Sequence, residues 1–333
     1  MTDSILEQAT LAHRGGDLKR ALELAEEGLA GTAVEVSPKD RYELCVLKSH
    51  CLSALGQWQE ALDALESAGK VDELDAAAQA RLAMHKGYLM GSLARYAECW
   101  SLLGQAEQKA RELRLPTLVA EILWRRGMMS IFVGDYDSAD ECLRSALELA
   151  SAENNQQLQG LTLAGLAKNL VYRGEYAAAI PRFEEALETF EKLESPFYCA
   201  IIWSELANCY LNVDEPEKAL QFFQKAESVF LESGATPNYQ VCLANIGNVY
   251  LYLREFLTAI SYYQRALELA RQLGDQLSIS KWLRNLSQAY SQLGNPELAK
   301  GFESEAKQVN DHLDAGRQRA KQIAASSKSA ANG

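Results

Sequence analysis

The sequence repeats itself with a period of forty residues, and this period constrains the fold more than any other feature. One small residue recurs at the same register position, which we use as an anchor: Ala21, Ala61, Cys99, Ala139, Ala179, Ala219, Ala259 and Ala299. Successive anchors are 40, 38, 40, 40, 40, 40 and 40 residues apart. A fixed period of this length is typical of repeat proteins, in which one repeat cannot bury its apolar face alone and the repeats must stack.

Other register positions predict the local structure of one repeat. The residues seven after and twelve before each anchor are Ala, Gly or Ser throughout, and such small residues let two helices pack at the close end of the usual range of about 8–10 Å. Gly is the commonest residue five before the anchor, where a left-handed backbone would end a helix; Ala94, Asp214 and Arg254 replace it in three repeats. Pro216 and Pro296 fit the first turn of the helix that follows. Each repeat is therefore predicted to be a helix, a tight turn, a second helix and a loop.

This pattern resembles the tetratricopeptide repeat family. The resemblance is best in LANIGNVYLYLREFLTAISYYQRALELA (residues 243–270) and LAGLAKNLVYRGEYAAAIPRFEEALETF (residues 163–190), and it extends over residues 2 to about 313. It implies an all-α fold, a right-handed superhelical α-solenoid of about eight helix-turn-helix repeats. The period of 40 instead of the common 34 residues is similar to the longer repeats of kinesin light chains, G-protein-signalling scaffolds and the sensor segments of bacterial signalling ATPases.

The expected domain organisation is one solenoid over residues 1–313 and a short tail. The expected repeats are 2–41, 42–79, 80–119, 120–159, 160–199, 200–239, 240–279 and 280–313. Within the segment 314–333, residues 315–333 contain four basic residues and no acidic one, and the segment ends in Ser, Ala and Gly. We expect a short basic capping helix there, followed by disorder; the alternatives are a linker to a further domain and a basic peptide that docks an acidic partner.

Charge and cysteine usage exclude several protein classes. The formal net charge is −12, whereas nucleic-acid binding requires a basic surface that displaces counterions from phosphates. Seven dispersed cysteines without a CxxC pair predict reduced core thiols. The N-terminus shows no signal peptide, and no apolar run approaches the roughly 18 residues that span a bilayer. We therefore expect a cytoplasmic protein that binds neither nucleic acid nor membranes; the sequence does not fix its oligomeric state.

No catalytic or metal-binding motif stands out. The four histidines are His13, His50, His85 and His312, and none lies in an HExxH or zinc-finger pattern. There is no phosphate-binding glycine loop. His50 and Cys51 are adjacent, but adjacent helical residues do not face one another. We expect no enzyme activity, no cofactor and no metal.

The resemblance implies that the first helix of each repeat lines a concave groove, and helical spacing identifies the side chains there. A polar zone comprises Lys168, Asn208, Asn248, Lys281, Arg284 and Gln288. Asn offers a donor and an acceptor, so Asn208 and Asn248 could hold the main chain of one extended peptide at successive repeats. Asn248 lies in IGNVY, where peptide-binding members of the family carry such an Asn. The alternative is that these are merely solvated groove residues.

An apolar zone lies on the same predicted face. Its members are Met84, Tyr88, Trp124, Met128, Phe132, Tyr172 and Tyr252. Large apolar residues on a solvent-facing stripe usually mark an interaction site. The alternative is that the superhelical interior or a neighbouring helix buries them.

The sequence thus predicts a non-enzymatic protein–protein interaction scaffold, or adaptor, that binds a peptide segment of a partner in its concave groove. The alternative is a sensory or regulatory array that controls an effector, such as a caspase-like protease or a signalling ATPase. That effector would be a separate chain or a further C-terminal domain.

Overall fold

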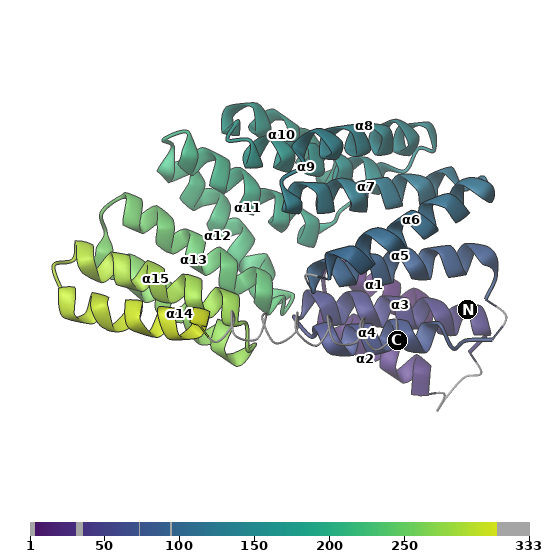
Figure 1. Ribbon diagram of the computed structural model, residues 1–333, viewed down its shortest axis with the longest axis horizontal. Coiled ribbons are helices and arrows are strands. Elements are labelled where there is room, and N and C mark those ends of the chain that lie inside the picture. The colour runs from purple at the N-terminus through teal and green to yellow at the C-terminus, as the bar shows by residue number, and fades with distance from the viewer. Residues whose placement is uncertain (1–3, 31–35, 73, 94, 312–333) are drawn as a thin grey trace, which may run out of the picture. The chain divides into compact units, whose positions relative to one another are not determined.

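The computed structural model describes residues 4–30, 36–72, 74–93 and 95–311 (Figure 1). The expected tail at 314–333 and the turn residue Ala94 lie outside these ranges. Every regular element within them is an α-helix, and consecutive helices form antiparallel pairs joined by tight turns. The predicted all-α superhelical repeat fold is therefore confirmed.

The helices alternate between two roles along the chain. The first helices of the repeats are α1 (Ile5–Arg14), α3 (Pro38–Ala54), α5 (Ala76–Ser92), α7 (Pro116–Val133), α9 (Gln156–Tyr172), α11 (Pro196–Asn212), α13 (Thr236–Tyr252) and α15 (Gln276–Gln292). The second helices are α2 (Leu18–Ala30), α4 (Trp58–Ala68), α6 (Tyr96–Glu112), α8 (Tyr136–Ala152), α10 (Tyr176–Lys192), α12 (Pro216–Glu232), α14 (Phe256–Gln272) and a final helix over 296–311. From α3 onward each first helix begins four residues before the expected repeat start, for example at Pro116 instead of residue 120.

The turn inside a repeat has the expected left-handed residue wherever the structure describes that residue. Gly134 has a φ of 83°, and the next amide, that of Asp135, donates to the Ser130 carbonyl at 2.9 Å. The Ser130 carbonyl also accepts from the Gly134 amide, so the two bonds together close the end of α7. The Asp135 side chain then accepts a hydrogen bond from the Ser138 amide and caps α8.

Two of these turns use a residue other than Gly in the left-handed conformation. Asp214 has a φ of 67° and Arg254 a φ of 63°. The turns between repeats show a second series that the sequence did not reveal, with positive φ at Arg114, Asn154, Glu194, Gly234 and Gly274. A Cβ is unfavourable in this region because it approaches the following carbonyl oxygen.

Arg254→Gly should stabilise the protein because it relieves this contact at an exposed position. We expect the free energy of unfolding to rise by about 1 kcal/mol, after allowance for the greater entropy of Gly in the unfolded chain. Urea unfolding followed by circular dichroism measures it. Arg254→Ala is the control, because it keeps the Cβ and should change stability by less than about 0.5 kcal/mol. Equal effects of the two variants would contradict the argument.

The small residues lie where helices pack most closely. All eight anchors are buried, from 0% exposure at Ala21 to 7% at Ala299. At Gly127, a Cβ would lie 2.6 Å from Cγ of Leu143 on the paired helix α8. The second helices add large core residues four positions after the anchor, including Phe183, Phe223 and Tyr263. Small and large residues therefore alternate across the helix pairs and fill a continuous core.

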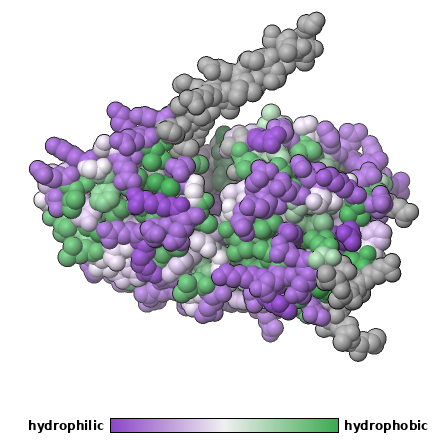
Figure 2. Space-filling model, turned by 90° about the horizontal axis from the view of Figure 1, so that it is seen from below, coloured by the Kyte–Doolittle hydropathy of each residue, from purple (hydrophilic) through white to green (hydrophobic). Residues whose placement is uncertain are grey.

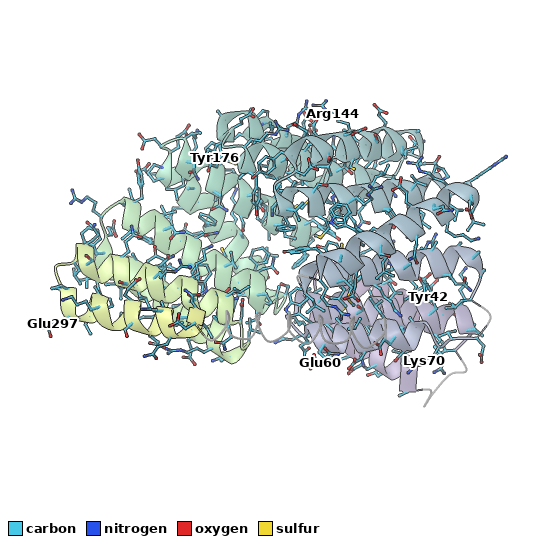
Figure 3. The ribbon with its side chains drawn as sticks, viewed as in Figure 1. Tyr42, Glu60, Lys70, Arg144, Tyr176 and Glu297 are labelled. Atoms are coloured by element: carbon cyan, nitrogen blue, oxygen red, sulfur yellow. The ribbon has the colours of Figure 1, made fainter. Side chains whose placement is uncertain are left out.

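Charged residues cover the outer faces of the second helices. Glu60 on α4, Arg144 on α8 and Glu297 on the final helix project away from the ribbon (Figure 3). The space-filling view shows hydrophilic residues over much of the visible face, with apolar ones between them (Figure 2). In the described ranges, no helix is long and apolar enough to cross a membrane.

The chain divides into two compact units, unit 1 (Met1–Thr236) and unit 2 (Pro237–Gly333). Within unit 1, the first repeat contacts the sixth. The turn between α1 and α2 approaches α11 so closely that a Cβ on Gly16 would lie 3.4 Å from the Phe197 Cβ. The Lys19 side chain packs against Gly234 in the same way. The first helices between these contacts therefore surround one interior.

Candidate functional site

The inner face of unit 1 is formed by side chains of α3, α5, α7, α9 and α11. Electrostatic effects show that these side chains are close across the interior. Burial lowers the pKa of His50 on α3 to about 3, and the charge of Arg125 on α7 contributes to this. Burial raises the pKa of Tyr198 on α11, while Arg125 opposes the rise. Arg125 thus influences groups on helices two repeats away in both directions.

An aromatic pair flanks Arg125 on this face. The rings of Tyr88 and Trp124 stack with centroids 6.4 Å apart. The Trp124 indole Nε1 donates to the Leu161 carbonyl on α9 at 3.1 Å, which fixes the ring. The Arg125 Cζ lies 4.6 Å from the Tyr88 centroid and 5.2 Å from that of Trp124. A cation over aromatic faces at these distances is attracted by the ring quadrupoles.

The apolar zone expected from the sequence divides into buried and exposed members. Met84 has no exposed surface and belongs to the core, so its assignment to a ligand-binding groove is corrected: the neighbouring helices bury it. Tyr88, Trp124 and Met128 are half-buried. Phe132 and Tyr172 are 52% and 45% exposed, and Tyr252 in unit 2 is 52% exposed.

Phe132, Val133 and Tyr172 form an exposed aromatic patch on unit 1. Phe132 and Tyr172 end the first helices of neighbouring repeats at the same register position, and their rings meet edge to face with centroids 6.5 Å apart. Val133 next to them is 49% exposed. Exposed apolar side chains that contact one another across repeats are a surface on which another protein can bury area.

Of the two polar candidates in unit 1, Lys168 is engaged in an ion pair within the protein. The Lys168 Nζ lies 2.7 Å from Oε1 of Glu205 on α11, and this carboxylate is the main cause of the raised pKa of Lys168. Lys168 is therefore an ion-paired residue of the inner face and offers a ligand little net charge. Asn208 is half-buried on α11.

Asn248 in unit 2 is held by a side-chain network. Its Oδ1 accepts hydrogen bonds from the Tyr263 hydroxyl at 2.7 Å and from Asn285 Nδ2 at 3.3 Å, and its Nδ2 donates to Asn245 Oδ1 at 3.3 Å. Only one Nδ2 hydrogen of Asn248 remains for a ligand. Asn248 therefore cannot both donate to and accept from a peptide group unless one of these hydrogen bonds breaks. Asn208 and Asn248 belong to different units, and their joint clamp stays a prediction.

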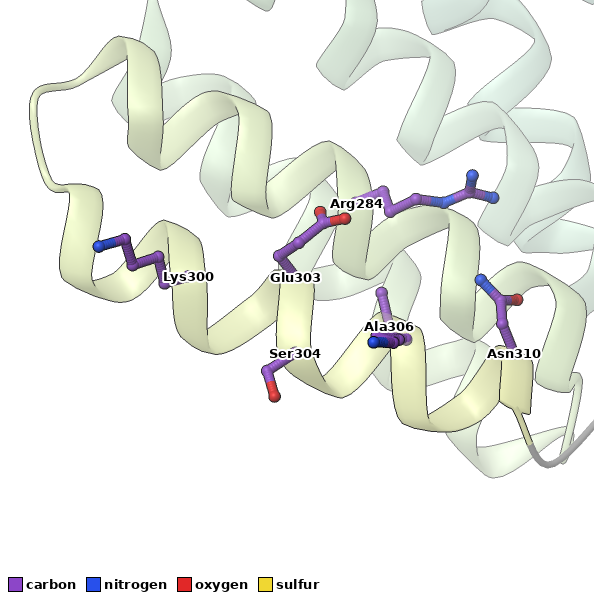
Figure 4. Close-up of a pocket in the computed structure, with 7 residues that line it drawn as sticks. Arg284, Lys300, Glu303, Ser304, Ala306 and Asn310 are labelled. Atoms are coloured by element: carbon purple, nitrogen blue, oxygen red, sulfur yellow. The ribbon is translucent and has the colours of Figure 1, made fainter.

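The other polar candidates of unit 2 are exposed on α15. Lys281 Nζ lies 4.9 Å from the Trp282 ring centroid, and partial desolvation of its ammonium group, together with the charge of Arg284, lowers the pKa of Lys281. Arg284 also lines an open hollow with residues of the final helix, among them Glu303 and Asn310 (Figure 4). Gln288 follows one turn later and is exposed.

The family assignment follows from the matching repeat models. Models described as tetratricopeptide repeat match residues 118–192, 165–238 and 239–309, which together cover 118–309 without a gap. This is more than half of the chain. The chain is a tetratricopeptide repeat protein. Its coarse function is accordingly that of a protein–protein interaction scaffold.

Similar proteins agree with this tetratricopeptide fold. The 43 kDa receptor-associated protein of the synapse of Tetronarce californica is 27% identical over 97 residues, which are 29% of this chain and 24% of that protein. This chain thus spans about a quarter of that relative's length. A Rap protein complexed with competence and sporulation factor superposes with a TM-score of 0.64 at 14% identity, covering 93% of this chain and 98% of that one.

Two further solved structures show the same architecture. Aspartyl phosphate phosphatase F of Bacillus subtilis has a TM-score of 0.54 at 16% identity and covers 93% of this chain and 94% of its own. A signal transduction ATPase with a tetratricopeptide repeat sensor from Pyrococcus horikoshii has a TM-score of 0.59 at 14% identity. It covers 96% of this chain and 50% of its own. At these identities the likeness concerns the fold alone.

The sequence interpretation missed one register position of the tetratricopeptide array. Fourteen residues before the anchor lie His85, Arg125, Glu205, Asn245 and Asn285, several of which make the contacts described above. His50 Nε2 lies 3.2 Å from His85 Nδ1, and the His13 ring is next to His50 with centroids 6.3 Å apart. Listing this position for every repeat would have shown that it is polar or charged except at Leu47 and Gly165. The described residues hold no cluster of three or more metal-ligating side chains.

Proposed function

We propose that this tetratricopeptide protein is an adaptor that binds a peptide segment of a partner protein on the inner face of unit 1. The observation that carries the proposal is the aromatic patch of Phe132, Val133 and Tyr172. Aromatic side chains bury large areas at little entropic cost and dominate protein interfaces. Half-exposed aromatic residues at the ends of two adjacent first helices are difficult to explain as core.

The spacing of the patch suits an extended peptide. The ring centroids of Phe132 and Tyr172 are 6.5 Å apart, which corresponds to about two residues of an extended chain. A peptide that crosses α7 and α9 would therefore place one side chain against Phe132 and the side chain two residues later, which lies on the same face, against Tyr172. The Rap protein similar in fold is complexed with a competence and sporulation factor, which is a precedent for ligand binding by this fold. In unit 2, the exposed polar residues that could contact a peptide are Lys281, Arg284 and Gln288.

The adaptor reading involves no reaction and no cofactor. A regulatory array that controls an effector would use the same binding face, and would differ in that peptide binding changes the activity of the effector. Sequencing peptides that bind the chain, selected from a displayed library, identifies candidate partners. An assay of the activity of those partners then distinguishes an adaptor from a regulatory array.

The proposal is tested with the full chain and a displayed library of random peptides. Selected peptides should bind the wild type, and the double variant Phe132→Ser/Tyr172→Ser should bind them about ten- to a hundredfold more weakly, because two hydrophobic contacts are lost. The loss should depend little on salt, since no charge is removed. Leu231→Ser is the matched control: Leu231 is 59% exposed on the second helix α12, and its variant should bind like the wild type. If the double variant binds like the control, the patch is not the site.

A further inference from the structure

The turn between α1 and α2 is buried, although the same turn is exposed in later repeats. Gly16 is buried, whereas Gly134, Gly174 and Gly294 at the same register position are exposed. A Cβ on Gly16 would lie 3.4 Å from the Phe197 Cβ, but a Cβ on any of the three other glycines would meet no atom within 4 Å. All four have a φ between 82° and 86°. The burial of Gly16 therefore comes from α11 and not from the turn itself.

An aromatic cluster at the start of α11 receives this turn. The ring centroid of Phe197 lies 6.1 Å from that of Tyr198 and 6.1 Å from that of Phe230. No other repeat has an aromatic residue at the position of Phe197; the residues there are Lys39, Ala77, Thr117, Gln157, Pro237 and Leu277. The surface that the first repeat touches is therefore specific to the sixth.

A second contact involves the loop between α12 and α13. A Cβ on Gly234 would lie 2.6 Å from Cε of Lys19, so the lysine stem lies directly across this glycine. Gly274 occupies the same register position with a similar φ, and a Cβ there would meet no atom within 4 Å. The first repeat thus contacts the sixth at two points that the equivalent glycines do not share.

The two contacts close the inner face of unit 1. Burial lowers the pKa of His50 and of Arg125, and it raises the pKa of Tyr198, the residue after Phe197. Polar groups held away from water are unfavourable, so their desolvation opposes the closed arrangement. A glycine and a lysine stem bury only a small apolar area, so a small change in free energy is enough to open it.

We propose that the α1–α2 hairpin is an autoinhibitory latch: it docks on α11 and on the loop after α12, and it must undock before a peptide can reach the interior side chains of unit 1. Undocking needs only small rotations at the stacking contacts of repeats 1 to 6, because these rotations add up along the array. Phe132 and Tyr172 stay exposed while the latch is closed. The inference rests on the proposed peptide-binding function and adds its regulation.

The first test measures the closure of the full chain without a ligand. Gly16→Cys/Phe197→Cys places two thiols on Cβ atoms 3.4 Å apart, close to the separation of about 3.5–4.5 Å in a disulfide. Under mild oxidation this pair should crosslink, and mass spectrometry of the digested protein detects the linked peptides. Gly174→Cys/Phe197→Cys is the control that should not crosslink, because Gly174 has open space around it. Equal yields for the two pairs, or no crosslink in either, would overturn the proposal.

The second test holds the latch open. The contact with Phe197 leaves no room for the side chain of Gly16→Arg, whereas Gly174→Arg has the same left-handed backbone and free space. Arg254 shows that this turn position accepts arginine. Peptides selected on the wild type from a random displayed library should bind Gly16→Arg about three- to tenfold more tightly, because more of the chain is open. They should bind Gly174→Arg within about twofold of the wild type.

The crosslinked variant supplies the opposite change. Oxidised Gly16→Cys/Phe197→Cys should bind the same peptides at least about tenfold more weakly than its reduced form, because the open state is no longer populated. Reduction with dithiothreitol should restore binding. The reduced form is the control, since it has the same two substitutions without the crosslink.

Three outcomes would contradict the proposal in different ways. Equal affinities of the wild type, Gly16→Arg and the oxidised crosslinked form, for peptides that still require Phe132 and Tyr172, would refute the latch and leave the peptide-binding function standing. Tighter binding by the crosslinked form would show that the closed state is the binding state. Absence of any peptide that binds either the wild type or Gly16→Arg would refute the proposed function itself.

Discussion

Phe190→Ala should lower the free energy of unfolding by about 3–5 kcal/mol. Phe190 on α10 has no exposed surface, and its ring stacks on that of Tyr198 with centroids 4.8 Å apart. The helices around Phe190 are already in close contact, since a Cβ on Gly160 would lie 2.9 Å from the Phe190 Cζ. They therefore cannot move together to fill the space that the lost ring would leave. The substitution therefore removes the transfer free energy of the ring and leaves a cavity between α9, α10 and α11. Urea unfolding of the full chain, followed by circular dichroism, measures the change.

Leu231→Ala is the control for this prediction. Leu231 lies on the following second helix, α12, but is 59% exposed, so its truncation should change stability by less than about 0.5 kcal/mol. Similar losses for the two variants would mean that Phe190 is not part of a close-packed core.

Gly247→Ala should destabilise unit 2 by about 1–3 kcal/mol, although Gly to Ala within a helix normally stabilises. A Cβ at Gly247 on α13 would lie 2.7 Å from Cε1 of Tyr263, which is completely buried on α14. Tyr263 cannot move freely, because its hydroxyl donates to Asn248 Oδ1. The overpacking should therefore outweigh the gain in helix propensity, which is at most about 1 kcal/mol.

Gly301→Ala provides the matched comparison in the same unit. Gly301 lies within the final helix, it is exposed, and a Cβ there would meet no atom within 4 Å. Only the higher helix propensity of Ala affects stability at this position, so the free energy of unfolding of this variant should rise by about 0.5–1 kcal/mol. The opposite signs of the two substitutions, measured by thermal and urea unfolding, are the result that tests the packing; a stabilising Gly247→Ala would show that α13 and α14 are not in close contact.

Turn and packing positions could be predicted because they recur in every repeat. Gly56, Gly134 and Gly174 adopt the expected left-handed backbone, and Pro216 begins α12 as its position implied. The left-handed residues between repeats were missed, because Arg114, Asn154 and Glu194 have no residue type in common. Their conformation follows from where the next repeat stacks, and it is not encoded by a local preference.

The candidate site could be predicted only in part. Helical spacing placed Trp124, Phe132 and Tyr172 on first helices, and it placed Met84 there too, although Met84 is buried in the core. Spacing alone fixes the face of a helix on which a residue lies, but not how far the neighbouring helices cover it. The same limit applies to Lys168, whose partner Glu205 is 37 residues away in the sequence.

The sequence by itself determined the family, the helix pairs and the register, because each of these depends on contacts within a repeat or between neighbouring repeats that recur every forty residues. The tertiary structure decided which residues of the inner face are paired and which are not. Arg125, Tyr88 and Tyr198 come from three different repeats, and the distances between them depend on how the stacked repeats curve around the interior. A small rotation at each stacking contact accumulates over several repeats, so these distances cannot be read from the pattern of any single repeat.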